Sequence, residues 1–386
     1  MGNRLTCLWK DRSVTRQFTT AVSLHGHTNR SKESLFFIGE FMTKHPVLRH
    51  GMPYLERRSL RASSIAPDLW KAYWTPPLPP LEAFTVEREQ IENGLGLQNL
   101  ISLTDHDSIQ APLLLRVVPE ARRIPVSLEW SVPFVGTEFH LGVHNLPTAE
   151  ASAWVMRLAE YTERPRPQQL RELLAAMAAI PQVLLILNHP LWDLPNIGKL
   201  EHRRAVRDLL SLANPFLHGF ELGGLRGWAE NCEVIELARA YGRPFIAGGD
   251  RHGCEPSALL NLTNAASFSE FAEEVRQGHS HVLAMPQYAD CTALRVYHTV
   301  LDVIRYYPDH PIGARHWDER VFHPDAQGVP RPVCMLWDYP PKFITRILKL
   351  VRLGDTEPVR RALRFAFKRG PQVPKIELEG GQEISL

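Results

Sequence analysis

Short apolar runs alternate with longer amphipathic segments from about residue 20 to 290 of this 386-residue chain. Each run has the length of a strand and ends in polar, often histidine-containing residues, and the segments between the runs show helical spacing. The strand-like runs are 18–24, 100–106, 124–130, 139–146, 183–190, 218–224, 245–250 and 281–286, and the helix-like segments are 82–95, 166–179, 201–213, 229–242 and 268–278. This alternation predicts a parallel α/β fold. A β/α barrel is favoured over an open sheet, because no Gly-rich phosphate-binding motif follows the first strand and polar residues recur after nearly every strand.

The pattern predicts three parts: an N-terminal segment 1–19, a barrel over 20–291 and a C-terminal extension over 292–386. Residues 38–80 interrupt the barrel, show little periodicity and end in a proline-rich stretch. Connections of this length often cover a functional site, so we expect a lid. The extension is basic and partly helical, with two short amphipathic segments at 343–353 and 357–370. They are interpreted either as helices packed on the barrel or as a surface for membrane or nucleic acid.

Composition narrows the classes of protein that need to be considered. Hydrophobic residues make up 44% of the chain and charged residues 22%, and the formal net charge is only +2. These values are typical of a globular protein and do not indicate a nucleic-acid partner. The five cysteines are widely spaced and form no CxxC pair, and there is neither a signal peptide nor an apolar run long enough to span a membrane. We therefore expect a cytoplasmic protein.

Histidine and acidic residues gather where the strand-like runs end. His25 and His27 form an HxH pair after the first run, and residues two apart on a strand face the same side. The other candidates are Asp105, His106, Glu129, His140, His189, Asp250 and His252. In a β/α barrel the carboxyl ends of the strands meet at one mouth, so these side chains are expected to converge. Imidazole and carboxylate ligands without thiolates predict Zn, Mn or Fe ions in an open catalytic site.

The motifs LHGHT, LTDHDS, LEW with a histidine eleven residues after its glutamate, NHP and GGDRH resemble, in this order, the motifs of the PHP (polymerase and histidinol phosphatase) superfamily. The resemblance covers about residues 20–290 and implies a distorted seven-stranded β/α barrel with two or three divalent metal ions. It assigns His25, His27, Glu129 and Asp250 to a first ion, Glu129, His140 and His189 to a second, and His106 and His252 to a third. It also implies that Asp105 orients a ligand imidazole.

One position departs from the family pattern. Members of its nucleotide-phosphatase branch carry an acidic ligand of the third ion five residues after the second histidine of HxH, where this chain has Lys32 followed by Glu33. A charged ammonium cannot bind a metal ion, so we expect Glu33 to take this role through a one-residue shift in the loop. The alternative is that both side chains face solvent and only two ions are held tightly.

The predicted function is a phosphoesterase that hydrolyses a phosphate ester of a small metabolite or nucleotide through a metal-activated hydroxide. A cation such as Arg251, Lys32 or Arg30 is expected to neutralise the remaining phosphate charge. Two alternatives stay open. One is an amidohydrolase-like enzyme that cleaves a non-phosphate bond, although the metal-bridging lysine usual in that class has no match here. The other is a non-catalytic, metal-stabilised binding module. The oligomeric state is not predicted.

Overall fold

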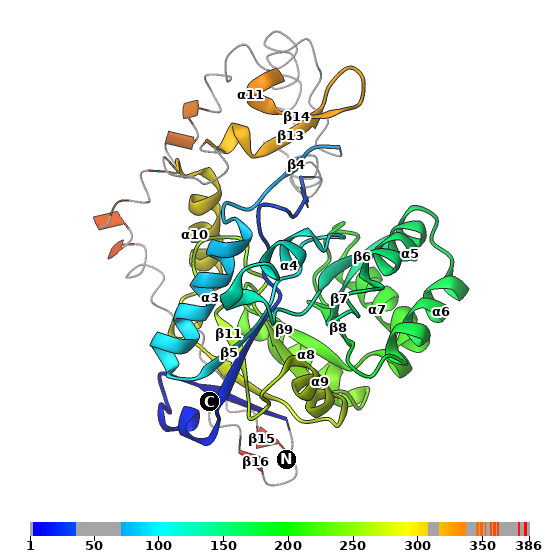
Figure 1. The fold of residues 1–386 in the computed structure, drawn as a ribbon, viewed down its shortest axis with the longest axis vertical. Coiled ribbons are helices and arrows are strands. Elements are labelled where there is room, and N and C mark those ends of the chain that lie inside the picture. Colours follow the sequence, from blue (N-terminus) through cyan, green and yellow to red (C-terminus); the bar gives the residue numbers. More distant parts are fainter. Residues whose placement is uncertain are drawn as a thin grey trace.

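The computed structural model describes residues 3–35, 71–307 and 316–336, together with scattered residues beyond 344. Most of the expected lid over 38–80 lies outside the described residues, and so do most of the two basic segments 343–353 and 357–370. Within the described part of the chain, no helix is long and apolar enough to cross a membrane. The described elements form a body of two sheets with helices around them, and a small third sheet lies at one end of this body (Figure 1).

The first sheet mixes parallel and antiparallel neighbours. Its order is β1 (Arg4–Cys7), β12 (His281–Ala284), β11 (Leu259–Thr263), β2 (Thr20–Leu24) and β5 (Gln98–Ser102). β1 pairs in parallel with β12, and β2 pairs in parallel with β5. β11 lies antiparallel to both of its neighbours, β12 and β2. The pairing of β1 makes part of the N-terminal segment 1–19 an integral strand of this sheet.

The second sheet also departs from the expected all-parallel arrangement. Its order is β10 (Phe245–Gly248), β9 (Gly219–Gly223), β8 (Leu184–Asn188), β7 (Thr137–His144) and β6 (Leu128–Phe134). β6 and β7 are antiparallel because only Val135 and Gly136 connect them, and both have the positive φ (47° and 74°) of a tight hairpin turn. β7 also runs antiparallel to β8. Mixed α/β architecture therefore replaces the predicted parallel one.

Isolated bridges join the two sheets at their edges. Gly26, after β2, bridges in parallel to Arg251, after β10, and His106, after β5, bridges in parallel to Glu129 of β6. The strands β2, β5, β6, β7, β8, β9 and β10 thus follow one another in a ring. The ring is not a continuously hydrogen-bonded closed barrel, which corrects the expected barrel. Where the ring is joined, single bridges replace extended ladders, because the chain leaves strand geometry at the polar residues that follow the strands.

The space inside the ring is apolar at one end. Val22 and Leu24 of β2, Leu184 and Ile186 of β8 and Ile246 of β10 pack together with α9 (Phe268–Arg276). The alternate residues of β8, Leu185 and Leu187, belong to the outer core beneath the helices. Both faces of such strands are buried, so their sequences are nearly continuous apolar runs. This packing leaves the opposite end of the strands for the polar side chains.

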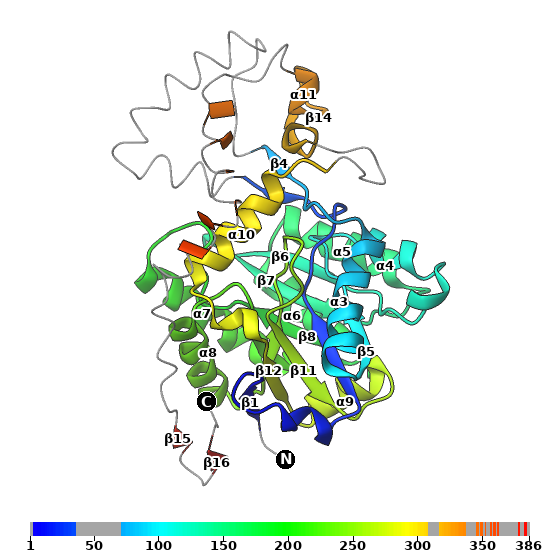
Figure 2. The same cartoon turned by 90° about the vertical axis from the view of Figure 1, so that its left-hand side faces the viewer.

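Helices cover the outside of the sheets (Figure 2). They are α3 (Pro80–Leu95), α4 (Gln110–Leu115), α5 (Ala151–Glu163), α6 (Pro167–Ala178), α7 (Lys199–Ala213), α8 (Trp228–Ala240), α9, α10 (Thr292–Ile304) and α11 (Val333–Leu336), with 3-10 turns at Ser13–Gln17, Pro119–Ala121, Asn214–Phe216, Pro286–Ala289 and Trp317–Glu319. Local sequence explains several ends. α3 begins at Pro80 and ends before Gly96, which has φ 70°. Ser267 caps α9 by accepting a hydrogen bond from the Glu270 amide.

The small third sheet connects distant parts of the chain. Its order is β14 (Pro330–Pro332), β13 (Val321–Pro324), β4 (Tyr73–Trp74) and β3 (Glu33–Ser34). A separate two-stranded pair is formed by β15 (Glu377–Leu378) and β16 (Gln382–Glu383). β3 follows the HxH motif, whereas β13 and β14 belong to the C-terminal extension. This extension therefore reaches the end of the ring where the polar residues gather.

Candidate metal centre

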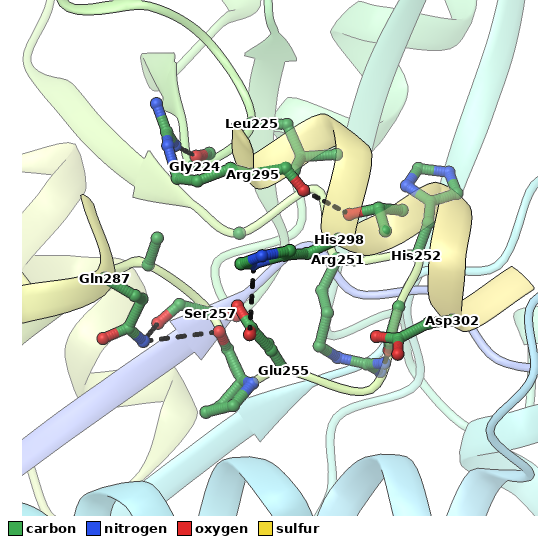
Figure 3. Close-up of a pocket in the computed structure, with 15 residues that line it drawn as sticks. Gly224, Leu225, Arg251, His252, Glu255, Ser257, Gln287, Arg295, His298 and Asp302 are labelled. Carbon is green, nitrogen blue, oxygen red and sulfur yellow. Dashed lines mark hydrogen bonds and ion pairs between the residues drawn. The ribbon is translucent and has the colours of Figure 1, made fainter. Parts of the chain in front are cut away.

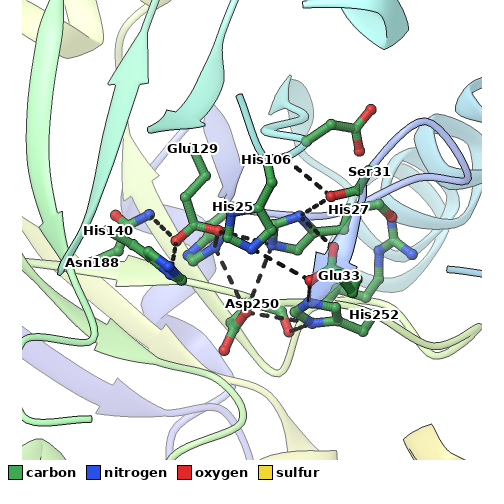
Figure 4. Close-up of polar contacts among 12 residues, drawn as sticks. His25, His27, Ser31, Glu33, His106, Glu129, His140, Asn188, Asp250 and His252 are labelled. Atoms are coloured by element: carbon green, nitrogen blue, oxygen red, sulfur yellow. Dashed lines mark hydrogen bonds and ion pairs between the residues drawn. The ribbon is translucent and has the colours of Figure 1, made fainter. Parts of the chain in front are cut away.

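Glu129 lies in the middle of a buried group of imidazoles (Figure 4). Its Oε2 is 3.0 Å from Nε2 of His25 and 3.2 Å from Nε2 of His27. Three further contacts surround the same carboxylate: His106 Nε2 at 3.3 Å from Oε2, His189 Nε2 at 3.1 Å from Oε1 and His140 Nδ1 at 3.3 Å from Oε1. Each oxygen of Glu129 thus faces a different set of imidazoles, which is the arrangement of a carboxylate able to bridge two ions.

Two further carboxylates complete the cluster. Oδ1 of Asp250 lies 3.6 Å from His25 Nε2 and 3.7 Å from His27 Nε2. Glu33 is only 6% exposed, and its carboxylate lies 3.4 Å from His27 Nδ1, 3.4 Å from His106 Nε2 and 3.1 Å from His252 Nε2. The structure therefore places Glu33 inside the cluster.

The donor atoms suit metal ions. Four groups each contain three ligand atoms that lie within 4.8 Å of one another. The groups are His25, His27 and Glu129; His25, His189 and Asp250; His27, Glu33 and His252; and His106, Glu129 and His140. Several of these buried atoms face one another as ion pairs but make no hydrogen bond of regular geometry, namely His25 Nε2, His27 Nε2, His140 Nδ1, Glu129 Oε2 and Glu33 Oε1. Buried polar atoms of this kind normally have a partner, which a divalent cation would supply. The chain thus contains the buried His, Glu and Asp clusters that the resemblance to the PHP superfamily implies.

The groups do not divide as the resemblance implies. His189 is grouped with His25 and Asp250, although its Nε2 also contacts Glu129, and His106 is grouped with Glu129 and His140. The groups share members, so the geometry does not assign each residue to one ion. It does bring all nine predicted metal ligands into one cluster.

Irregular backbone, not strand alternation, directs several of these side chains. β2 ends at Leu24, so the HxH pair lies beyond the strand. His25, His189 and Asp250 have positive φ values of 62°, 27° and 48°, which are uncommon for residues with a side chain. Such strain is retained where the surrounding structure holds it, and it is frequent at functional sites.

Two other positions differ from the sequence-based expectation. Glu129 is the second residue of β6 rather than its last, and His140 lies in the first half of β7. His140 still reaches the cluster because β7 runs antiparallel, which places the first half of this strand near the cluster.

Asp105 does not orient an imidazole, contrary to the expectation. Its carboxylate is fully buried and accepts hydrogen bonds from the backbone amide of Thr28 at 2.6 Å and from the Thr28 hydroxyl at 2.7 Å. Asp105 therefore holds the chain that immediately follows the HxH motif. This makes it a positioning residue for the loop between His27 and Glu33.

Arg251 is held by partners within the protein, whereas the expected contacts of Lys32 and Arg30 with phosphate stay predictions. The guanidinium of Arg251 is buried, with Nε 3.0 Å from Glu87 Oε1 and hydrogen bonds from Nη1 to the Gly253 carbonyl and from Nη2 to the His27 carbonyl. Its donors are thus used within the protein. Lys32 is exposed, and its Nζ lies 5.6 Å from the ring centre of Tyr73. Arg30 is also exposed.

Sequence reasoning missed three polar residues that hold the cluster from outside. Oε2 of Glu221 lies 2.6 Å from Nδ1 of His25, Oε1 of Glu138 lies 3.3 Å from Nε2 of His140, and the Asn188 amide donates to Glu129 Oε1 at 2.9 Å. Carboxylates in these positions fix the orientation of a ligand imidazole. A Cβ at Gly248 would lie 2.2 Å from the Glu221 carboxyl carbon, so only glycine leaves room for it. The lone glutamate in the apolar run 218–224 was the available signal.

Electrostatics favour cations in this cluster. Burial opposes protonation of His25, but the carboxylates of Glu129 and Glu221 raise its pKa well above the usual value. Burial likewise opposes protonation of His106 and His140, yet Glu33 and Glu129 raise the pKa of His106 to about 10, and Glu129 raises that of His140 to about 9. Burial lowers the pKa of His189 to about 3. In the metal-free protein, protons thus partly offset the charge of the carboxylates.

Metal binding at neutral pH is expected to release protons. His106 and His140 carry protons below their raised pKa values, and an imidazole must be deprotonated to bind a metal ion. The apparent affinity for Mn²⁺ should therefore rise with pH between neutrality and about pH 9. Titration calorimetry in two buffers with different ionisation enthalpies measures this release. A binding heat that is the same in both buffers would contradict the prediction.

No protein-family model matches this chain, and no curated protein matches its sequence. Among solved structures, it is similar to an amidohydrolase from Chromobacterium violaceum with bound sulfate and no metal (14% identity, 46% of this chain and 83% of that chain, TM-score 0.32). It is also similar to PsfC from Pseudomonas syringae PB-5123 (13% identity, 56% of this chain and 88% of that chain, TM-score 0.36). A third similar structure is a candidate metal-dependent phosphoesterase from Bifidobacterium adolescentis (14% identity, 52% of this chain and 92% of that chain, TM-score 0.32). At these TM-scores the similarities do not by themselves assign a function to this chain.

Proposed function

We propose that this chain is a metal-dependent hydrolase of the PHP superfamily that cleaves a phosphate ester of a small metabolite or nucleotide. The observation that carries the proposal is the position of Glu129, whose two oxygens face four buried imidazoles and the partly buried imidazole of His106, while Glu33 and Asp250 lie beside them. Ion pairs built only for stability do not need so many unpartnered donor atoms, because each one costs free energy on folding.

Each part of the cluster has a defined task in this proposal. The ligands for two or three divalent ions of Mn, Zn or Fe are His25, His27, Glu33, His106, Glu129, His140, His189, Asp250 and His252. Bound ions would lower the pKa of a water molecule and neutralise charge on a phosphoryl group. Glu221 and Glu138 hold His25 and His140 in place, since each carboxylate accepts a hydrogen bond from the imidazole nitrogen that points away from Glu129.

Arg226 is the cation best placed to meet a phosphate. Its Nη2 lies 3.1 Å from Asp250 Oδ2, and its guanidinium carbon lies 4.0 Å from the ring centre of Trp192. Trp192 in turn packs edge-on against the ring of His189 at 5.0 Å. The side chain of Arg226 is 15% exposed, and its Nε has no hydrogen-bond partner. Because stacking on Trp192 and the contact of Nη2 with Asp250 fix the guanidinium, its Nε is the donor left for a phosphate oxygen.

A small hollow lies directly beside the cluster. It is lined by Glu138, Phe139, His140, Asn188, His189, Trp192 and Leu194. Two of these residues, His140 and His189, are candidate metal ligands, and three, Phe139, Trp192 and Leu194, present apolar surface. A substrate group next to the scissile phosphate would meet this surface.

Replacing Arg226 with methionine is expected to weaken phosphate binding. Loss of a charged hydrogen bond of about 1.5–3 kcal/mol corresponds to roughly a 10- to 100-fold increase in KM for phosphate esters and in the inhibition constant of inorganic phosphate. The matched control is Arg157→Met, because Arg157 also stacks on a tryptophan, Trp154 at 4.3 Å, but lies on α5. If Arg226→Met and Arg157→Met have equal KM values, the role of Arg226 is wrong.

The experiment that tests the proposed function combines metal analysis with substrate assays. The full-length protein is purified, its transition-metal content is measured, and hydrolysis of para-nitrophenyl phosphate, of the bis-ester and of an amide analogue is followed with Mn²⁺ and Zn²⁺. The proposal expects at least two ions per chain and cleavage of a phosphate ester. Turnover of the amide alone would favour the amidohydrolase alternative, and a protein that is fully active without metal would refute both.

A further inference from the structure

The helix α10 lies outside the part of the chain that resembles the family and touches the loop that carries His252. Oδ2 of Asp302, a buried residue of α10, accepts a hydrogen bond of 2.7 Å from the backbone amide of Cys254, two residues after His252. The contact is close, since a Cβ at Gly253 would lie 2.8 Å from the same oxygen. Figure 3 shows Asp302 beside the loop that contains Arg251 and His252. The conformation of this loop therefore depends on α10.

The same helix also contacts a second loop of the centre. Arg295, only 7% exposed, donates hydrogen bonds to the carbonyls of Gly224 and Arg226, the latter at 2.8 Å. Between α10 and the two loops lies a small cavity, which Arg295, His298 and Asp302 help to line (Figure 3). These polar contacts cross from the helix to the loops beside this cavity.

Two parts of the C-terminal extension, here called its two arms, contact the centre: the first is α10, and the second is β13, which reaches the strand of Glu33. β13 pairs with β4, and β4 pairs with β3, in which Glu33 lies opposite Trp74. The rings of Phe322 in β13 and Tyr73 in β4 stack at 4.9 Å with an angle of 6° between their planes. β3 and β4 have only two residues each, so they need a further strand to form a stable sheet. β13 supplies that strand.

Arg320 joins the two arms. It is 2% exposed, and its Nη2 donates hydrogen bonds to the carbonyls of Val303 and Arg305 at the end of α10. Its own carbonyl accepts a hydrogen bond of 2.9 Å from the amide of Thr75, directly after β4. The helix and the small sheet are therefore connected through one buried residue.

We propose that the C-terminal extension positions one ligand group of the metal centre, the group formed by His27, Glu33 and His252. Asp302 sets the loop of His252, and Phe322 sets the strand of Glu33, so the extension supports two of the three residues of this group. This inference rests on the proposed function because it takes the group to be a metal site. It assigns α10 and β13 of the extension a task within the centre.

The test is a Mn²⁺ titration of the full-length chain by calorimetry, with bound and free ions counted by electron paramagnetic resonance. In Asp302→Ala and in Phe322→Ala, one of three ions is expected to bind about 10- to 100-fold more weakly, the usual effect of removing a group that supports a ligand. The other two ions keep their affinity. The double variant is expected to weaken this same ion further and to leave the other two unchanged, because the two residues support different ligands of one ion.

Two variants separate positioning from general damage to the fold. Asp302→Asn keeps an oxygen that accepts from the Cys254 amide, so this variant should retain wild-type metal binding. Val300→Ala changes a residue of α10 that is 43% exposed, and it should bind all ions normally. The inference is overturned if the Asp302→Ala and Phe322→Ala proteins bind Mn²⁺ as the wild type does, if all ions weaken equally, or if the wild type binds only two ions. A wild-type protein that binds no Mn²⁺, Zn²⁺ or Fe²⁺ would instead refute the proposed function.

Discussion

Glu129→Gln is expected to abolish most of the activity and to reduce the metal content of the protein. The amide nitrogen of glutamine cannot bind a metal ion, so the variant loses the carboxylate that lies between His25 and His27 on one side and His140 and His189 on the other. Metal ions stabilise the charge of a transition state by several kcal/mol, which corresponds to a fall in kcat on the order of 1000-fold. Elemental analysis and kcat measured on para-nitrophenyl phosphate check both effects.

The matched comparison for this variant is Glu221→Gln. Glu221 is equally buried but touches only the far nitrogen of His25, so it acts through the imidazole. A loss of about 10- to 100-fold is expected there, the scale for groups that orient a ligand. Should Glu129→Gln retain full metal occupancy and a near-normal kcat, the bridging carboxylate would have to be another residue.

Glu33→Gln is expected to remove one ion and to lower kcat by about 10- to 100-fold or more. The reason is geometric, because the Glu33 carboxylate lies within 3.4 Å of His27, His106 and His252. The remaining ions should stay bound, since the contacts of Glu129 with His25, His140 and His189 do not involve Glu33. Metal stoichiometry and kcat measured on the same preparation test this prediction.

Glu201→Gln is the control for Glu33→Gln. The Glu201 side chain is 58% exposed on α7 and pairs only with the exposed Arg204 in the described part of the chain. This change should leave metal content and kcat as in the wild type. Wild-type values in Glu33→Gln as well would show that the centre uses two ions and that Glu33 is not a ligand.

Local sequence predicted the parts of this protein that depend on local physics. The strand β8 could be identified because both of its faces are buried, which makes 183–187 a continuous apolar run. α9 could be identified because Phe268, Phe271, Ala272 and Val275 recur on one face of a helix. The imidazole and carboxylate residues that follow such strands indicated the candidate ligands, because burying several such groups together costs free energy unless they bind a shared partner such as a metal ion.

Sequence alone could not predict how neighbouring strands run or how the sheets meet. The direction of β7 depends on a two-residue turn at Val135 and Gly136, and a β-branched residue such as Val135 is not expected at the positive φ that this turn requires. The junctions between the sheets consist of single bridges at Gly26 and His106. Such contacts form only when both sheets are assembled, so no local pattern marks them.

The candidate ligands of the centre could be selected from the sequence, whereas the partners of its charged neighbours were decided by tertiary structure. Asp105 and Arg251 stand inside the motifs, yet Thr28 and Glu87 hold their charges away from the centre. Glu221 and Arg226 stand outside the motifs, yet they contact His25 and Asp250. The physical reason is that the partner of a buried side chain depends on which distant elements pack against it. His25 and Glu221, for example, are 196 residues apart in the sequence. Spacing along the sequence carries information only about neighbours on the same strand, helix or turn.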